Sequence, residues 1–133
     1  MAAIEGSCLC GSVGWRLDGT PERIVVCNCT ACRRHGAITA YGHEGHDVAV
    51  SGSTRAFTRP PDLSLEFHFC PVCGCYAFWR ATALETDGRR RMAVNLRLAD
   101  PDVVGSFPVG RFDGFDEFVP MPPDGRCVRD YWF

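Results

Sequence analysis

Clustered cysteines constrain this chain of 133 residues more than any other feature of its sequence. Seven of the nine cysteines fall into three short motifs, Cys8-Leu-Cys10, Cys27-Asn-Cys29-Thr-Ala-Cys32 and Cys70-Pro-Val-Cys73. Cysteines one or two residues apart seldom bridge each other without strain, whereas their sulfurs converge easily on one metal ion. The odd total also argues against a disulfide framework. The motifs therefore predict thiolate ligands in a reducing compartment.

Zinc is the metal that these motifs favour. Thiolates are soft ligands, and zinc accepts four of them in a tetrahedron. Short Cys-x-x-Cys loops also suit zinc–sulfur bonds of about 2.3 Å. An iron–sulfur cluster is the competitor, but the cysteine runs of ferredoxins have a different spacing. We therefore expect zinc as the cofactor.

The third motif is the strongest single signal for a metal site. Cys70 and Cys73 supply two ligands, and Gly74 lets the backbone turn so that its N–H groups face the sulfurs. Such a loop needs two further ligands, which Cys8 and Cys10 can supply. A site closed by four cysteines is structural.

The central motif then remains with three ligands, Cys27, Cys29 and Cys32. Three protein ligands and an open fourth position describe a catalytic zinc. Spacing alone also allows a different, ribbon-like site, formed by two cysteines of the central motif and two of the third motif: Cys29, Cys32, Cys70 and Cys73. We expect Cys75 and Cys127 to pack as small apolar side chains, with the alternative that one of them completes the second site.

The pattern of apolar and polar residues predicts a mainly β fold. Strand-like stretches lie at 12–17, 23–27, 37–41, 47–51, 54–58, 63–69, 75–80 and 91–96. Residues 30–35 fit one helical turn that ends at Gly36. Residues 100–133 are rich in Pro, Gly and Phe without a clear period, so we expect a loop-rich cover. The length suits one domain, 1–133, with its motifs within 6–80.

Charge and hydropathy exclude other classes. The chain carries 16 acidic and 14 basic residues, and the resulting net charge of −2 argues against a dedicated nucleic-acid binder. No apolar run approaches the roughly 18 residues that would cross a membrane. The first residues lack the basic head and apolar stretch of a signal peptide, so we expect a cytoplasmic protein. The oligomeric state is not predicted by any of these features.

Three motifs, in order and at matching spacing, resemble a known family. They are Gly6-Ser7-Cys8-Leu9-Cys10-Gly11-Ser12-Val13, Cys27-Asn28-Cys29-Thr30-Ala31-Cys32-Arg33-Arg34-His35-Gly36 and Phe69-Cys70-Pro71-Val72-Cys73-Gly74. In this respect the chain is similar to the glutathione-dependent formaldehyde-activating enzymes, which share their domain with centromere protein V. One position departs from the family pattern, because Asn28 stands where the family usually has His.

The resemblance implies a β-tent-like fold that holds two zinc ions. It implies a structural zinc on four cysteines, Cys8, Cys10, Cys70 and Cys73. It implies a catalytic zinc on three cysteines, Cys27, Cys29 and Cys32. At that second zinc, glutathione and formaldehyde would join as S-hydroxymethylglutathione.

These features predict a carbon–sulfur lyase that acts on a thiol–aldehyde adduct, with a glutathione-like thiol and a small aldehyde as partners. Zinc with three thiolates has a formal charge of −1, so exchanging water for a substrate thiol is more natural than activating water strongly. Arg33 and Arg34 follow the ligands directly and are candidates for gripping a carboxylate of the thiol. The alternative is a non-catalytic, zinc-stabilised binding module.

Overall fold

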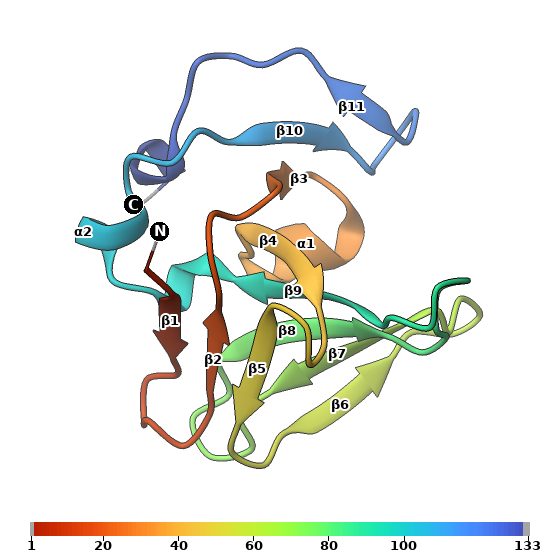
Figure 1. Ribbon diagram of the computed structural model, residues 1–133. Coiled ribbons are helices and arrows are strands. Elements are labelled where there is room, and N and C mark those ends of the chain that lie inside the picture. Colours follow the sequence, from red (N-terminus) through yellow and green to blue (C-terminus); the bar gives the residue numbers. More distant parts are fainter. Residues whose placement is uncertain (1, 132–133) are drawn as a thin grey trace.

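Short strands make up most of the regular structure of the chain (Figure 1). The computed structural model describes residues 2–131. The strands are β1 (Ile4–Ser7), β2 (Gly14–Leu17), β3 (Ile24–Cys27), β4 (Thr39–His43), β5 (Val48–Ser51), β6 (Arg55–Thr58), β7 (Leu65–Phe69), β8 (Tyr76–Ala81), β9 (Arg91–Asn95), β10 (Gly110–Asp113) and β11 (Val119–Met121). The α-helices are α1 (Thr30–His35) and α2 (Pro101–Val104), and the 3-10 helices are η1 (Leu96–Leu98) and η2 (Val128–Tyr131). The predicted mainly β fold is therefore confirmed. Within residues 2–131, no helix is long and apolar enough to cross a membrane.

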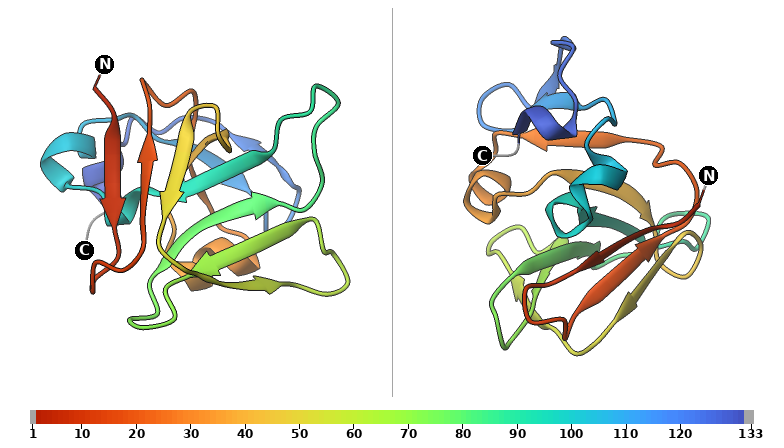
Figure 2. Two further views of the ribbon diagram at one scale, coloured as in Figure 1. Left: turned by 60° about the horizontal axis from the view of Figure 1, so that its bottom comes forward. Right: turned by 90° about the vertical axis from the view of Figure 1, so that its left-hand side faces the viewer.

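The strands form two sheets. The small sheet has the order β1-β2-β5 and the large sheet the order β11-β10-β3-β4-β9-β8-β7-β6. Neighbouring strands run antiparallel, except that β10 pairs with β3 in parallel. The β10–β11 hairpin and β6 lie at opposite ends of the large sheet, which the right-hand view of Figure 2 makes clear.

One hydrophobic core joins the two sheets. Successive side chains of a strand point to opposite faces, so each strand gives alternate residues to the core. In β9, Met92 and Val94 point into it, whereas Arg91 is exposed on the other side. Facing side chains from both sheets are buried together: Ile4, Trp15, Leu17, Val48, Phe78, Met92 and Val94. Burial of these apolar groups holds the small sheet against the large one.

The opposite face of the large sheet carries a second apolar cluster. Register places Tyr41 of β4 opposite Ala93 of β9, Ala93 opposite Trp79 of β8, and Trp79 opposite Phe67 of β7. We call these residues (Tyr41, Ala93, Trp79 and Phe67) the aromatic row. Ala31 of α1 packs against the same cluster, so the fold carries the central cysteine motif to an aromatic surface.

Helix α1 is short, and a specific residue caps each of its ends. The side chain of Cys29 caps its N-terminus by accepting a hydrogen bond from the backbone N–H of Cys32 at 3.3 Å. Gly36 ends it in the left-handed conformation with φ = 64°, which glycine adopts without a Cβ penalty. The predicted helical turn at 30–35, ended by Gly36, is confirmed.

Residues 100–133 contain more regular structure than the expected loop-rich cover. They include α2, β10, β11 and η2, and β10 extends the large sheet through its pairing with β3. Strands β10 and β11 are short, with four and three residues, and β10 joins the sheet through a strand more than eighty residues earlier in the sequence. Strand β1, with four residues, was not expected either. Residues 132 and 133 of the expected cover lie outside the described residues.

The assignment of the core can be tested by replacing two phenylalanines, one at a time, with alanine. Phe78 is 1% exposed inside the core, whereas Phe57 is 53% exposed on β6. We expect Phe78→Ala to lower the free energy of unfolding by about 3–5 kcal/mol, because it removes buried contacts and leaves a cavity. Phe57→Ala should cost less than about 1 kcal/mol. Urea unfolding of the metal-loaded protein measures both, and equal losses would contradict this core.

Candidate metal centre

The first cysteine cluster brings together two distant turns of the chain. The sulfurs of Cys8, Cys10, Cys70 and Cys73 all lie within 4.8 Å of one another, and we call them the four-cysteine cluster. The Sγ atoms of Cys8 and Cys10 are 3.7 Å apart, and those of Cys10 and Cys70 are 3.6 Å apart. Four sulfurs at tetrahedral corners, each about 2.3 Å from a metal, are about 3.8 Å from one another. The cluster therefore has the spacing of a closed tetrahedral metal site.

Backbone amides surround the sulfurs of this cluster. The N–H of Val13 donates to Cys8 Sγ at 3.2 Å, and the N–H of Val72 donates to Cys70 Sγ at 3.4 Å. The N–H of Cys75, followed by that of Cys10, lowers the pKa of Cys73 to about 5 by donating a hydrogen bond to its sulfur. Such donors stabilise negative sulfur, which is the form that binds a metal.

The second cluster comes from the end of β3, the connection that follows it and the first turn of α1. The sulfurs of Cys27, Cys29 and Cys32 lie within 4.8 Å of one another, and we call them the three-cysteine cluster. Backbone N–H groups of Cys29 and Cys32 donate to Cys27 Sγ at 3.4 Å and to Cys29 Sγ at 3.3 Å. A hydrogen bond from the Cys32 thiol lowers the pKa of Cys29 to about 5. Within residues 2–131, no further Cys, His, Asp or Glu joins this group at that distance.

The remaining cysteines lie apart from the three-cysteine cluster. Cys75 lies near the other cluster, where the N–H of Leu9 donates to its sulfur at 3.5 Å. The thiol of Cys127 donates to Asp130 Oδ2 at 3.3 Å. Neither is placed to complete a second site. The structure also separates the members of the ribbon-like alternative, because Cys29 is grouped apart from Cys70 and Cys73.

A cleft of about 600 Å³ opens beside the three-cysteine cluster, and we call it the cysteine cleft. Tyr41, Trp79 and Phe67 of the aromatic row form one part of its wall. Polar and charged side chains also line it: Arg23, Thr30, Arg59, Asp62, Ser64 and Arg91. All three cysteines of the cluster line this space, which has the size of a small-molecule site.

Asn28 fastens the β10–β11 hairpin over the cysteine motif. Its backbone N–H donates to the carbonyl oxygen of Phe112 at 3.3 Å, and its Nδ2 donates to Asp113 Oδ1 at 3.2 Å. In return, Asn28 Oδ1 accepts the backbone N–H of Phe115 at 3.0 Å. The residue that departs from the family pattern therefore holds a wall of the cysteine cleft, which also includes Phe118.

The hairpin passes so close to the sulfurs that only glycine fits at one position. A Cβ atom on Gly114 would lie 2.7 Å from Cys27 Sγ and 2.7 Å from Cys29 Cβ. These distances are shorter than van der Waals contact, so a larger residue would displace the hairpin or the cysteine loop. Gly114 was missed in the sequence, because its partners lie more than eighty residues away.

Arg33 and Arg34 do not line the cysteine cleft. Both are exposed in the last turn of α1, and Arg34 Nη1 donates to the carbonyl oxygen of Thr30 at 3.2 Å. Their contact with a substrate carboxylate stays a prediction. The next residue, His35, packs instead, with its ring stacked 4.4 Å from the ring of Tyr76, and burial lowers its pKa.

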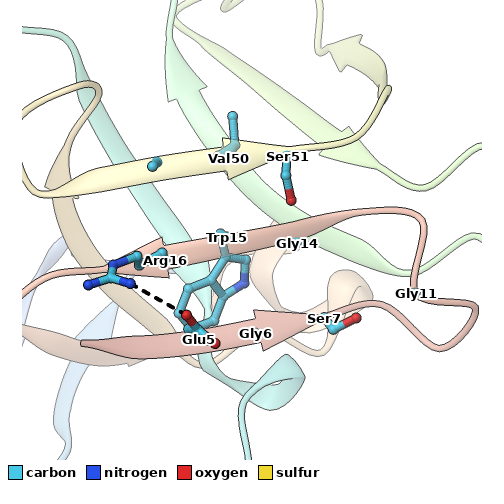
Figure 3. A pocket seen from close by; sticks show the side chains of 10 residues that line it. Glu5, Gly6, Ser7, Gly11, Gly14, Trp15, Arg16, Val50 and Ser51 are labelled. Atoms are coloured by element: carbon cyan, nitrogen blue, oxygen red, sulfur yellow. Dashed lines mark ion pairs between the residues drawn. The ribbon is translucent and has the colours of Figure 1, made fainter. Parts of the chain in front are cut away.

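A second hollow, of about 350 Å³, lies on the small sheet and includes Trp15 in its wall (Figure 3). An ion pair of 3.6 Å joins Arg16 Nη1 to Glu5 Oε1 at this hollow. Its lining contains no cysteine and no histidine. We therefore place the candidate chemistry in the cysteine cleft.

The fold and the two cysteine clusters define a small mainly β protein with two groups of cysteines, each of which could hold a metal ion. The family model described as glutathione-dependent formaldehyde-activating enzyme matches residues 3–103, and the chain belongs to this family. The resemblance noted in the three motifs is thereby confirmed. Strands β10 and β11 lie outside the matched residues.

Two further comparisons concern individual proteins. No curated protein matches the chain. The crystal structure of a Rhodobacter sphaeroides protein, a structural genomics target, is similar with a TM-score of 0.59 and 24% identity. The similarity covers 79% of this chain and 98% of that one. At this identity the likeness supports the fold.

The contact at Gly114 leads to a stability prediction with a matched control. We expect Gly114→Ala to lower the free energy of unfolding by about 1–3 kcal/mol, because the added methyl group collides with the cysteine loop. At Gly110 the same methyl group would meet only the carbonyl oxygen of Ile24 at 3.4 Å, an ordinary contact. Gly110→Ala should therefore change the free energy by less than about 1 kcal/mol. Urea unfolding that ranks the two variants in the opposite order would contradict the placement of the hairpin.

Proposed function

We propose that the chain is a zinc enzyme of the carbon–sulfur lyase type that acts on a thiol–aldehyde adduct. The observation that carries this proposal is the contrast between two cysteine clusters in one small fold. One has four sulfurs, whereas the other has three and faces a cleft of about 600 Å³. The family to which the chain belongs suggests glutathione as the thiol and formaldehyde as the aldehyde.

The sulfur geometry supports zinc as the metal of both clusters. Sulfur–sulfur distances of 3.6 and 3.7 Å in the four-cysteine cluster fit tetrahedral zinc, which accepts four thiolates. We assign a structural role to that zinc, because its ligands leave no open position. We assign a catalytic role to zinc on Cys27, Cys29 and Cys32, where one position stays open for a ligand from the cleft.

The chemistry of the reaction is an addition or its reverse. The thiol sulfur bonds to the carbonyl carbon of the aldehyde, and the thiol proton ends on the carbonyl oxygen, so that no oxidant or reductant is consumed. Zinc on three thiolates supplies a position at which a substrate thiol loses its proton. Backbone amides of Cys29 and Cys32 hold the protein sulfurs in place, and the hairpin around Gly114 covers one side of them.

Two broader statements complete the proposal. We propose that residues 1–133 form one domain, since a single core joins both sheets of the described part. We also propose a cytoplasmic location, because thiolate ligands and free cysteines persist in a reducing compartment. The competing function, a zinc-stabilised binding module, is tested by the experiments that follow.

Metal content and stability test the closed site. The wild-type protein should contain about two zinc ions per chain when expressed with ample zinc. Cys73→Ser should prevent stable folding, because binding of a structural zinc contributes on the order of 10 kcal/mol to folding. Cys75→Ser, next to the cluster, should retain both ions and a near-normal melting temperature. Iron with sulfide in elemental analysis, or equal melting temperatures for wild type and Cys73→Ser, would contradict the assignment.

Cobalt substitution tests the open site. Thiolate–cobalt charge transfer reports each added sulfur, so glutathione should intensify this absorption band in the wild type. Cys29→Ser should respond much less, because it damages the three-cysteine cluster while leaving the other four ligands intact. Turnover is followed by NMR with ¹³C-formaldehyde as an exchange between formaldehyde and S-hydroxymethylglutathione that is faster than in the same solution without protein. A band that no thiol changes, together with no turnover, would favour the binding module.

A further inference from the structure

The guanidinium groups of Arg23 and Arg91 pack over rings of the aromatic row in the wall of the cysteine cleft. The Cζ atom of Arg23 lies 5.3 Å from the centre of the Tyr41 ring. The Cζ atom of Arg91 lies 5.8 Å from the same ring and 5.4 Å from the ring of Trp79. The two residues are far apart in the sequence, but they lie near the starts of β3 and β9, which both pair with β4. The fold thus brings two guanidinium groups to one tyrosine.

Among residues 2–131, these two arginines have no acidic partner, in contrast to two neighbouring arginines. Arg80 and Arg90 of the same sheet region pair with Glu44 at 2.6 and 3.3 Å. For Arg23 and Arg91, the part of the chain from 2 to 131 offers no carboxylate within ion-pair distance. A guanidinium that rests on an aromatic ring keeps its in-plane N–H donors for another group.

The charge in the cysteine cleft also favours an anion. Arg23, Arg59 and Arg91 line it, and Asp62 is the acidic residue among its lining groups. Asp62 already accepts the backbone N–H of Ser64 at 3.0 Å, and Arg59 acts on it electrostatically. Apart from the cysteines, the positive side chains that line the cleft therefore outnumber the negative one.

We propose that Arg23 and Arg91 form a carboxylate-binding subsite of the cysteine cleft, so that the ligand is a carboxylate-bearing thiol or thiol adduct. The inference rests on the proposed function for the sulfur end of the ligand. Its sulfur lies at the three-cysteine cluster, its chain follows the aromatic row, and its carboxylate accepts N–H donors from both guanidinium groups. In this proposal the carboxylate is bound inside the cleft and not at the exposed end of α1, where Arg33 and Arg34 lie.

Pairs of thiols that differ only in their second functional group separate the contribution of the carboxylate to binding from that of the sulfur. Cobalt-substituted protein is titrated with ω-mercaptoalkanoates of increasing length and with ω-mercaptoalkanols of the same lengths, and the charge-transfer band gives each Kd. At the best length the acid should bind at least about tenfold more tightly than the alcohol, because charge-assisted hydrogen bonds hold it. Arg23→Gln and Arg91→Gln should each reduce this ratio about fivefold or more, with little change for the alcohol. Arg16→Gln, on the small sheet, is the control and should keep the wild-type ratio.

A second probe distinguishes failure of this subsite from failure of the metal proposal. The S-methyl ether of the best mercaptoalkanoate keeps the carboxylate but blocks the sulfur, and its binding is followed by the fluorescence of Trp79 in the cleft wall. If no thiol changes the cobalt band, yet this ether binds wild type and not Arg91→Gln, the carboxylate subsite stands and the proposed function fails. Equal affinity for acids and alcohols at every length would overturn the subsite. Loss of the preference in Arg33→Gln, with Arg23→Gln and Arg91→Gln unchanged, would overturn it as well.

Discussion

The convergence of four sulfurs from two distant turns is the interaction on which the rest of the structure depends. Cys8 and Cys10 lie in the turn after β1 of the small sheet, whereas Cys70 and Cys73 lie in the turn between β7 and β8 of the large sheet. This junction closes one end of the core that the two sheets share. Unpaired thiols at such distances would gain little from one another, but thiolates around a metal ion would join the sheets with much of the free energy of folding. We expect a metal ion in this cluster to act as a fixed support for the strands on either side of it.

The three-cysteine cluster has one sulfur fewer than the four-cysteine cluster, and its surroundings differ accordingly. The end of β3, the connection after it and the first turn of α1 supply one sulfur each, and the parallel pairing of β3 with β10 brings the C-terminal hairpin over them. Asn28 holds that hairpin by its side-chain amide, and Gly114 lets it approach the sulfurs. The hairpin lies beyond the residues that the family model matches, which end at 103. Cluster and hairpin therefore form the cysteine cleft together, and specificity is expected to depend on the hairpin wall.

Local patterns in the sequence predicted local structure. Features that depend on contacts between distant parts of the chain could not be predicted in this way. Alternation over several residues identified β2 and β7, and Gly36 identified the end of α1. Each cysteine motif also predicted which sulfurs lie together within one loop. The partition between the two clusters stayed open in the sequence, because it depends on how the sheets are paired. Arg23 and Arg91 could not be found for the same reason, since only the strand order β3-β4-β9 brings them to one ring. Asn28 was recognised as a departure from the family, but its partners come from a hairpin too short to show a period.

Cadmium NMR of the protein loaded with ¹¹³Cd tests most directly the central claim, that one fold holds a closed and an open thiolate site. Cadmium replaces zinc at thiolate ligands, and its resonance responds to each change in the set of ligands. The account predicts two resonances of equal intensity, of which only one shifts when a carboxylate-bearing thiol is added. The resonance that stays constant belongs to the cluster of Cys8, Cys10, Cys70 and Cys73. A single resonance, or two that both ignore every thiol, would contradict the account.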